Sequence, residues 1–551
     1  MENVNRIGGY MNNKMYEKGI QAQVCYEDLL DKLGEDPKTK VIFNVNDDSE
    51  KLLKKACVTH NPFPGLLKVV LFSLRRKAVK KLYEEEKVLQ TGPAAAILAL
   101  DAVLAKEFGE MRNGEANKGA VTCDVTFAGL QVIRLYMSAY RGNKQFVKSR
   151  YDSAIRVDNA LNGSFYKYET KDNRKFSAHV YYESQKRKIM NTLGIKKDPD
   201  KFVFGSLPSD KRLTAKAISK WDALELEDAT FADGACGCML RDRSEWEEME
   251  VGKAVCDMPL YRLKKVADSP VKDFGKADMN KGPLSGIKVL DLTHIIAGPA
   301  CTRLLAEQGA DVLMIRRGDY LHQEQAMLEL DGWAGKNSIQ LDFNIDAELA
   351  RAKELVKEAD IVICSYQNGA LDKFGLGEED ILKMNPSVIF GSLVCFSDSV
   401  WQTRPGWAPC AEDITGLSVR NGSIDEPVNL NGVPLDYIPG MILFAGVMKA
   451  LKLQAKKGGS YTVHGSLTRG GYWLHECTDV WENDKDVEYK HSRLSTVHSK
   501  KIWKDVYHKV EDTAVGDVYF PAPATYFDNM DYIFSNMHFT DGNDDYQSNK
   551  Q

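Results

Sequence analysis

Short apolar runs alternate with amphipathic stretches through the second half of the chain. Residues 287–292 form a run with the length and composition of a buried strand, and Gly298 and Pro299 open a helix-like stretch. Gly309 ends that stretch, and a second strand-like run over 311–315 follows at once. Proline is favoured in the first turn of a helix and glycine just after its last turn. The pattern predicts an α/β fold with a doubly wound, Rossmann-like parallel sheet and added helices.

The same alternation continues toward the C-terminus. Residues 338–342, 361–364 and 388–395 are strand-like, and residues 347–358 have the apolar spacing of a helix. Before about residue 280 the chain has several helical stretches and fewer strands. Residues 266–282 carry proline and glycine among charged residues, which is typical of a linker. We therefore expect two parts, residues 1–280 and residues 281–551.

An internal similarity connects these two parts. In residues 92–125 a Gly-Pro pair opens an apolar helix, which leads through a glycine to a strand-like run. Residues 439–464 repeat this order with a Pro-Gly pair. Two copies of half a fold would explain the similarity, and so would two common helix–glycine–strand units.

Length, charge and cysteine content limit the number of domains, the kinds of partner and the compartment that we expect. With 551 residues the chain is long enough for two to four domains of roughly 150 residues each. The formal net charge of −5 gives no reason to expect nucleic acid or an anionic membrane surface as a partner. No apolar run of about 18 residues is available to cross a bilayer. Eleven scattered cysteines, an odd number, are typical of a reducing compartment. We expect a cytoplasmic protein, with mitochondria or another intracellular compartment as alternatives.

Several common catalytic signatures are missing from the sequence. It contains no phosphate loop, no Gly-x-Gly-x-x-Gly after the run 287–292, no His-Glu-x-x-His and no Gly-x-Ser-x-Gly. Cys236 and Cys238 would suit a metal, but no second ligand pair stands at zinc spacing. We interpret them as packed thiols and expect no metal.

Six segments, taken in order, resemble class III CoA-transferases, a family that includes formyl-CoA transferases, carnitine CoA-transferases and α-methylacyl-CoA racemases. They are residues 286–299, 304–312, 335–342, 359–363, 369–375 and 385–389. The likeness covers about residues 283–475. It implies the interlocked architecture of this family, coenzyme A as a co-substrate, and an acyl-CoA and a carboxylic acid as partners.

The N-terminal part also resembles this family, although less specifically. Residues 166–177 resemble the strand-turn-strand entry to its small domain, and residues 243–246 resemble its helix near the acyl pocket. A plain hairpin and a surface helix would explain both about as well. The resemblance implies a small α+β domain near residues 165–265. The order of the parts resembles long two-half members typical of fungi. Residues 1–280 would then be a degenerate CoA-transferase-like half, and residues 281–551 a Rossmann-like CoA-binding catalytic half. Such a chain is expected as a homodimer or as an intramolecular pseudo-dimer.

Several cations stand at or just beyond the predicted strand ends, where an open α/β sheet binds its ligands. Coenzyme A is phosphorylated and needs such cations, although any single lysine is equally well explained as surface charge. The resemblance implies a set of residues that line the CoA site. They are His294, Ile295, Ile296, Ala297, Arg317, Lys336, Tyr366 and Lys373.

Asp436 is the candidate catalytic residue. By local sequence alone it would be a helix cap, because a carboxylate there meets the positive end of the helix dipole. The resemblance implies that Asp436 is instead the nucleophile, which forms an acyl-aspartyl anhydride and then an aspartyl-CoA thioester. Gly440 would let the substrate approach. The first half has Leu89 to Gly92 at the matching place, so one active site per chain is expected.

Two departures from the family's pattern bear on the reaction. Trp407 stands where the racemases carry a histidine, and an indole is no acid or base near neutral pH. Ile296 stands where formyl-CoA transferases carry a glutamine, which argues against formate and oxalate. Glu412 and Asp413 lie nearby and are equally well explained as surface acids. CoA transfer is the leading prediction, with an acyl-CoA racemase or isomerase, or a catalytically silent CoA-binding protein, as alternatives.

Overall fold

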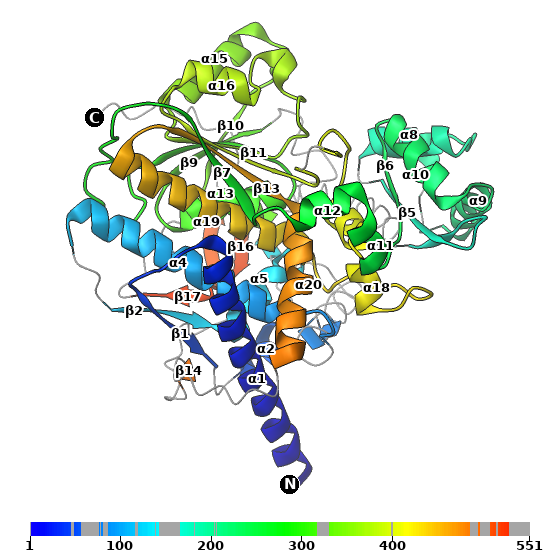
Figure 1. The fold of residues 1–551 in the computed structure, drawn as a ribbon, viewed down its shortest axis with the longest axis horizontal. Coiled ribbons are helices and arrows are strands. Elements are labelled where there is room, and N and C mark those ends of the chain that lie inside the picture. The colour runs from blue at the N-terminus through cyan, green and yellow to red at the C-terminus, as the bar shows by residue number, and fades with distance from the viewer. Residues whose placement is uncertain are drawn as a thin grey trace.

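A seven-stranded sheet forms the centre of the second half (Figure 1). The strand order is β10–β9–β8–β11–β12–β13–β7, and all neighbours are parallel except β7 on β13. The chain runs outward from β8 to β10 and then returns to β11, which confirms the predicted doubly wound sheet. The bounds are β7 Tyr261–Ala267, β8 Lys288–Leu292, β9 Asp311–Arg316, β10 Asn337–Gln340, β11 Ile361–Cys364, β12 Ile389–Val394 and β13 Ser460–Ser466.

The computed structural model describes only part of the 551 residues. The described ranges are 2–45, 49–56, 76–77, 79–80, 86–115, 119–137, 139–142, 166–180, 182–202, 204, 207–316, 330–397, 400–484, 494–495, 507–513 and 516–527.

Helices cover both faces of the large sheet. On one face α13 (Ala297–Glu307) packs against α19 (Pro434–Lys457), and on the other lie α15 (Asp346–Glu358) and α16 (Glu378–Met384). Alternate residues of a strand feed the two layers: Ile361 faces α13 and α19, and Val362 faces α15 and α16. By length and composition α19 would suit a membrane span, but most of it is buried in this core.

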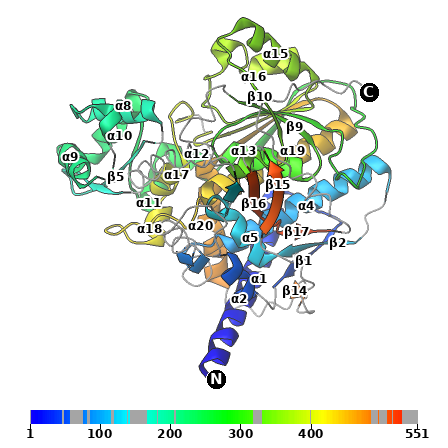
Figure 2. The ribbon, with the colours of Figure 1, turned by 180° about the vertical axis from the view of Figure 1, so that it is seen from behind.

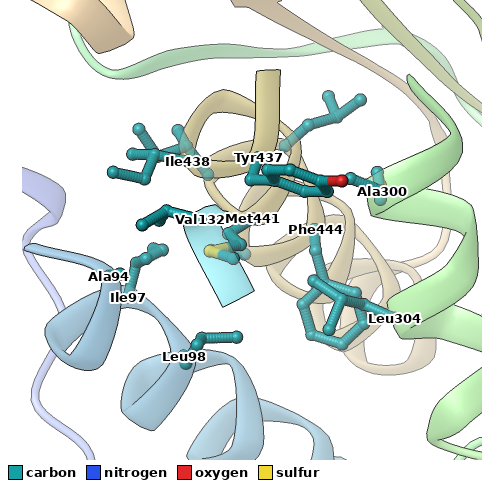
Figure 3. Close-up of a cluster of buried hydrophobic side chains, with 14 of the residues drawn as sticks. Ala94, Ile97, Leu98, Val132, Ala300, Leu304, Tyr437, Ile438, Met441 and Phe444 are labelled. Carbon is teal, nitrogen blue, oxygen red and sulfur yellow. The ribbon is translucent and has the colours of Figure 1, made fainter. Parts of the chain in front are cut away.

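The N-terminal half contributes a second, smaller sheet in the order β14–β1–β2–β17. Its helix α4 packs against α19, and Figure 3 shows Ala94, Ile97 and Leu98 of α4 facing Met441 and Phe444 of α19. The elements of this half are α1 Glu2–Leu33, β1 Lys40–Asn44, α2 Ser49–Ala56, α4 Thr91–Asn113, β2 Ala120–Asp124, α5 Val125–Val132, α6 Arg134–Met137 and β3 Ala139–Gly142.

The similarity between residues 92–125 and residues 439–464 has a structural counterpart. In both, a long apolar helix leads through glycine into a strand, α4 into β2 and α19 into β13. Each strand pairs in parallel with the strand before the helix, β2 with β1 and β13 with β12. Each also pairs antiparallel with a strand from elsewhere in the chain, β17 and β7. These matching pairings favour two copies of half a fold.

The two halves exchange strands, as β7 in Figure 1 and β14 to β17 in Figure 2 show. Strand β7 precedes residue 280 but forms the edge of the large sheet, next to β13. Near the other end of the chain, β14 (Leu494–Ser495), β16 (Gly516–Pro521) and β17 (Thr525–Tyr526) pair with β1, β3 and β2, and β15 (Tyr507–Thr513) pairs with β16. Pairing covers edges that would otherwise be open. The strands therefore cross the expected boundary at residue 280, and the halves interlock.

A small α+β domain lies between β3 and β7, as predicted. Its three-stranded antiparallel sheet has its own apolar core under the flanking helices. The elements are β4 Tyr168–Glu169, β5 Lys175–His179, α8 Glu183–Thr192, η1 Pro199–Lys201, α9 Pro208–Ile218, α10 Ala223–Ala232, β6 Cys236–Met239, α11 Arg243–Glu248 and α12 Glu250–Cys256.

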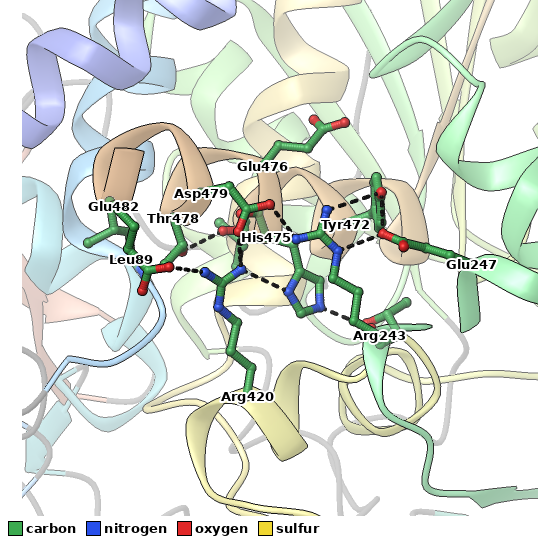
Figure 4. A network of polar contacts seen from close by, with 12 residues as sticks. Leu89, Arg243, Glu247, Arg420, Tyr472, His475, Glu476, Thr478, Asp479 and Glu482 are labelled. Atoms are coloured by element: carbon green, nitrogen blue, oxygen red, sulfur yellow. Dashed lines mark hydrogen bonds and ion pairs between the residues drawn. The ribbon is translucent and has the colours of Figure 1, made fainter. Parts of the chain in front are cut away.

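A polar network around His475 of α20 joins α11 to α18 and to the end of α17 (Figure 4). Arg420 donates to Asp479 at 2.8 Å, and Arg243 forms an ion pair with the same carboxylate. His475 donates from Nε2 to the carbonyl oxygen of Thr415 at 2.9 Å. Burial and the two arginines lower the pKa of His475 to about 3, so this histidine is neutral near pH 7. The helices involved are α17 Ala408–Ile414, α18 Leu417–Asn421 and α20 Leu467–Asp484.

Candidate active site at the sheet edge

The carboxyl ends of β8 and β11 form the switch point of the large sheet. The two strands are neighbours, with Leu292 opposite Cys364, and the chain leaves them in opposite directions. His294 follows β8 and Tyr366 follows β11; their rings stack with centroids 4.4 Å apart. The backbone N–H of His294 donates to Oγ of Ser365 at 3.0 Å. Ligands of doubly wound sheets bind at such a point, so two of the predicted CoA-site residues meet where a ligand is expected.

The loop between β8 and α13 packs tightly against the residues that follow β11. A Cβ on Gly298 would lie 2.7 Å from side-chain carbons of Thr293 and Ser365. Only glycine therefore fits at this position of the first turn of α13 without displacing these neighbours. Ile295 has a φ of +66°, a costly conformation for a β-branched residue. The first N–H groups of a helix have no partner inside it and suit a phosphate. The backbone at the start of α13, which includes Ala297, is therefore suited to bind an anion.

The other predicted CoA-site residues differ in burial, and one lies outside the described residues. The side chains of Ile295 and Ile296 are buried in the core, 9% and 4% exposed, which leaves only their backbone for a ligand. Lys373 is exposed on η4 (Asp372–Phe374), over the ring of Phe374. Arg317 lies outside the described residues.

Lys336 forms a buried ion pair under the loop. Its ammonium group bonds to Asp291 at 2.7 Å, to Thr302 at 2.6 Å and to the carbonyl oxygen of Pro299 at 3.3 Å. Neither charged side chain of the pair is exposed to solvent. The ammonium group thus ties β8 to the first turns of α13. We correct its expected role from ligand contact to support of the loop.

Asp436 lies in the first turn of α19 and is half-buried. Among the described residues its carboxylate accepts no hydrogen bond, so it does not act as the helix cap that local sequence suggests. Burial, together with the carboxylates of Glu412 and Asp331, raises the pKa of Asp436 to about 8. A carboxylate with a strongly raised pKa is typical of a functional site.

Gly440 brings Asp436 to the loop before α13. A Cβ on Gly440 would lie 2.6 Å from the carbonyl oxygen of Ala297 and 2.9 Å from Cβ of Ala300. Gly440 therefore serves close packing of α19 on α13, and our expectation that it admits substrate is corrected. Residues four apart share a face of a helix, so Asp436 lies on the face of α19 that meets the start of α13. The first turn of α19, which carries the candidate nucleophile, thus precedes the point where α19 packs on the start of α13.

Glu412 is a second carboxylate of the site that sequence reasoning did not select. It lies on α17, is only 1% exposed, and accepts hydrogen bonds from Asn429 at 2.8 Å and from the backbone of Leu430 at 2.9 Å. Burial raises the pKa of Glu412 to about 7 in spite of these bonds. Glu412 and Asp413 are both buried, so the alternative that they are surface acids is wrong. Nothing in the local sequence distinguishes a buried glutamate from an exposed one.

A buried polar network connects the helix of Asp436 to Arg134 of the N-terminal half through Asp331. Tyr437, the next residue, donates from its hydroxyl to Asp331 at 3.1 Å. Arg134 of α6 is fully buried, with its Nε 3.4 Å from the same carboxylate and its Nη1 donating to Gln131 at 2.8 Å. A buried charge is stable only when it is paired, so this network couples the two halves directly under the candidate site.

The fold and the site define an α/β protein with a ligand site at the switch point of a doubly wound sheet and a carboxylate beside it. Residues 284–508 match the family model described as CoA-transferase family III.

Curated relatives are similar to this chain over part of their length. An acyl-CoA transferase of Gibberella moniliformis is 31% identical over 323 residues, 55% of this chain and 54% of the relative. The acetyl-coenzyme A transferase nodX of Hypoxylon pulicicidum is 26% identical over 348 residues, 59% and 58% of the two chains. A formyl-CoA:oxalate CoA-transferase of Escherichia coli is 35% identical over 188 residues, 32% and 45%. The chain thus spans about half the length of these relatives.

Solved structures also show partial likeness. A CAIB/BAIF family protein from Brucella suis has 24% identity and a TM-score of 0.34, covering 43% of this chain and 65% of that one. The hypothetical protein Rv3272 from Mycobacterium tuberculosis has 23% identity and a TM-score of 0.33, covering 36% and 59%.

Proposed function

We propose that this protein is a CoA-transferase that moves CoA from an acyl-CoA to a carboxylic acid, with Asp436 as the nucleophile. The observation that carries the proposal is the carboxylate of Asp436, whose pKa is raised to about 8, on a helix that packs against the start of α13 within the segment that matches the family III model. The acyl-CoA would bind at the switch point, near His294, Ala297, Tyr366 and Lys373. The interlocked halves would act as an intramolecular pseudo-dimer.

The proposed chemistry has two exchanges. A carboxylate oxygen of Asp436 attacks the thioester carbonyl carbon, the C–S bond breaks, and CoA leaves as a thiolate. The thiolate then attacks the aspartyl carbonyl of the anhydride, the acyl group leaves as a free carboxylate, and an aspartyl-CoA thioester remains. A second carboxylate takes CoA by the reverse steps. Backbone N–H groups at the start of a helix are suited to stabilise the negative oxygen that develops in each attack.

Trapping of the covalent intermediates tests this proposal. The protein is incubated with a panel of acyl-CoA thioesters, quenched with hydroxylamine or borohydride, and digested for mass spectrometry. We expect a hydroxamate or an alcohol confined to Asp436, because both intermediates carry an activated carbonyl on that side chain. Binding of CoA without any modification, and without CoA exchange between acids, would refute it. Deuterium exchange at the α-carbon in that case would indicate a racemase or isomerase, and no reaction would indicate a silent CoA-binding protein.

The pH dependence of transfer should report the pKa of Asp436. Only the ionised carboxylate attacks, so kcat/KM should rise with pH and level off above about 8. Glu412→Gln removes a neighbouring negative charge and keeps an oxygen that can accept from Leu430. Because that charge helps to raise the pKa of Asp436, its loss should move the rise to lower pH.

The matched control is Glu379→Gln on α16, whose side chain is 89% exposed. Its pH profile should coincide with that of the wild type. If Glu412→Gln also leaves the midpoint of the profile in place, the two carboxylates are not coupled in the way we infer.

A further inference from the structure

Three buried side chains of metal-binding type meet where the small α+β domain contacts α17. His179 of β5, Cys238 of β6 and Cys410 of α17 place one ligand atom each within 4.8 Å of one another. Sγ of Cys238 lies 3.5 Å from Nε2 of His179. All three residues are 0% exposed. The cluster lies outside the proposed CoA site and has no part in its chemistry.

The cluster is assembled by strand pairing. In the antiparallel ladder of β5 and β6, Ser177 stands opposite Cys238 and His179 opposite Cys236. Alternate residues of a strand share a face, so both pairs lie on one face of this small sheet. Helix α17 packs on that sheet and brings Cys410 to it. The three ligand residues are therefore far apart in sequence, and no spacing motif reveals them.

The observed separations suit a tetrahedral zinc ion. A zinc–sulfur bond of about 2.3 Å and a zinc–nitrogen bond of about 2.0–2.1 Å at tetrahedral angles place the two ligand atoms about 3.5 Å apart. The distance between Cys238 and His179 has this value. Oγ of Ser177 lies 3.3 Å from both of these atoms, so this hydroxyl, or a water that it holds, is placed for the fourth position.

The charges around the cluster also suit a divalent cation. Two thiolates and a neutral imidazole balance the charge of Zn²⁺, which is the condition for burying an ion at low cost. The nearby carboxylate of Asp413 is already paired with Lys167 and accepts from Ser177 at 2.5 Å. No uncompensated charge would be left at the site.

We propose that His179, Cys238 and Cys410 bind one Zn²⁺ ion that fastens the small α+β domain to α17. Cys410 and Glu412 lie on the same short helix, so the ion would hold the segment that carries the second carboxylate of the candidate site. This replaces our expectation of no metal, which came from the spacing of the cysteines. The proposal does not depend on the reaction that the protein catalyses.

Metal analysis of the full chain, purified without chelators, tests the proposal. Elemental mass spectrometry should find about one zinc per chain in the wild type and background zinc in His179→Ala and Cys238→Ser. Cys123→Ser is the control, because Cys123 is an equally buried thiol on β2, and this variant should keep its zinc. Unchanged zinc in both cluster variants would overturn the proposal.

A second measurement avoids variants that fail to fold. Wild-type protein stripped of metal under reducing conditions is titrated with Co²⁺, and the visible spectrum should develop the intense bands of tetrahedral cobalt with a sulfur-to-cobalt charge-transfer band. Absence of both zinc and these cobalt bands would overturn the proposal. So would a disulfide between Cys238 and Cys410 in the protein as purified under reducing conditions, since it would consume both thiolate ligands.

Discussion

Asp436→Asn is expected to abolish CoA transfer while the fold remains intact. The amide has nearly the shape of the carboxylate but cannot attack a thioester, so the rate of transfer should fall by at least about 10³-fold. Transfer is measured as the movement of labelled CoA from an acyl-CoA to a second acid. Asp346→Asn is a matched control, because Asp346 also lies in the first turn of a helix but is exposed. A variant at Asp436 that keeps transfer would exclude it as the nucleophile.

The same substitution should make the protein more resistant to unfolding at alkaline pH. The pKa of Asp436 is raised in the folded state, so its contribution to stability is complete below the pKa of the unfolded chain and is lost as pH rises through about 8. Asparagine has no charge to bury, so Asp436→Asn should unfold at a higher temperature than the wild type at pH 9. Thermal unfolding of both proteins at pH 5 and at pH 9 measures this difference. A lower unfolding temperature for Asp436→Asn than for the wild type at pH 9 would contradict the raised pKa of Asp436.

Lys336→Met is expected to destabilise the protein strongly. It removes one partner of a fully buried ion pair and leaves Asp291 charged without its cation, which typically costs about 3–5 kcal/mol in the free energy of unfolding. Urea denaturation measures the loss. Adding Asp291→Asn should recover part of it, because the unpaired charge is then removed.

Lys373→Met is the matched control for this prediction. Lys373 is exposed, so its loss should change the free energy of unfolding by no more than about 0.5 kcal/mol. If Lys373 contacts the phosphates of CoA, its loss should raise the KM for acyl-CoA. A Lys336→Met variant of normal stability with a raised KM would restore the original expectation that Lys336 contacts the ligand.

Much of the fold was predictable because it depends on local pattern. The alternation of apolar runs and helices over residues 287–395 predicted the doubly wound sheet, since strands and helices differ in apolar period. The resemblance selected Asp436, which lies in the first turn of α19, and His294 and Tyr366, which follow β8 and β11. Both properties follow from residues close together in sequence, or from segments in a fixed order.

Only the tertiary structure decided which polar residues are buried and what they meet. Lys336 and Glu412 look like ordinary charged residues in the sequence, but packing of α13 and α17 removes them from water and changes what each can do. His179, Cys238 and Cys410 meet because a ladder and a helix contact bring distant segments together. The exchange of β7 and β17 between the halves has the same origin. The sequence by itself determined the elements, because local spacing encodes them, and its resemblance to a family supplied the candidate nucleophile. Burial, pKa and convergence depend on contacts between distant segments, which no local spacing encodes.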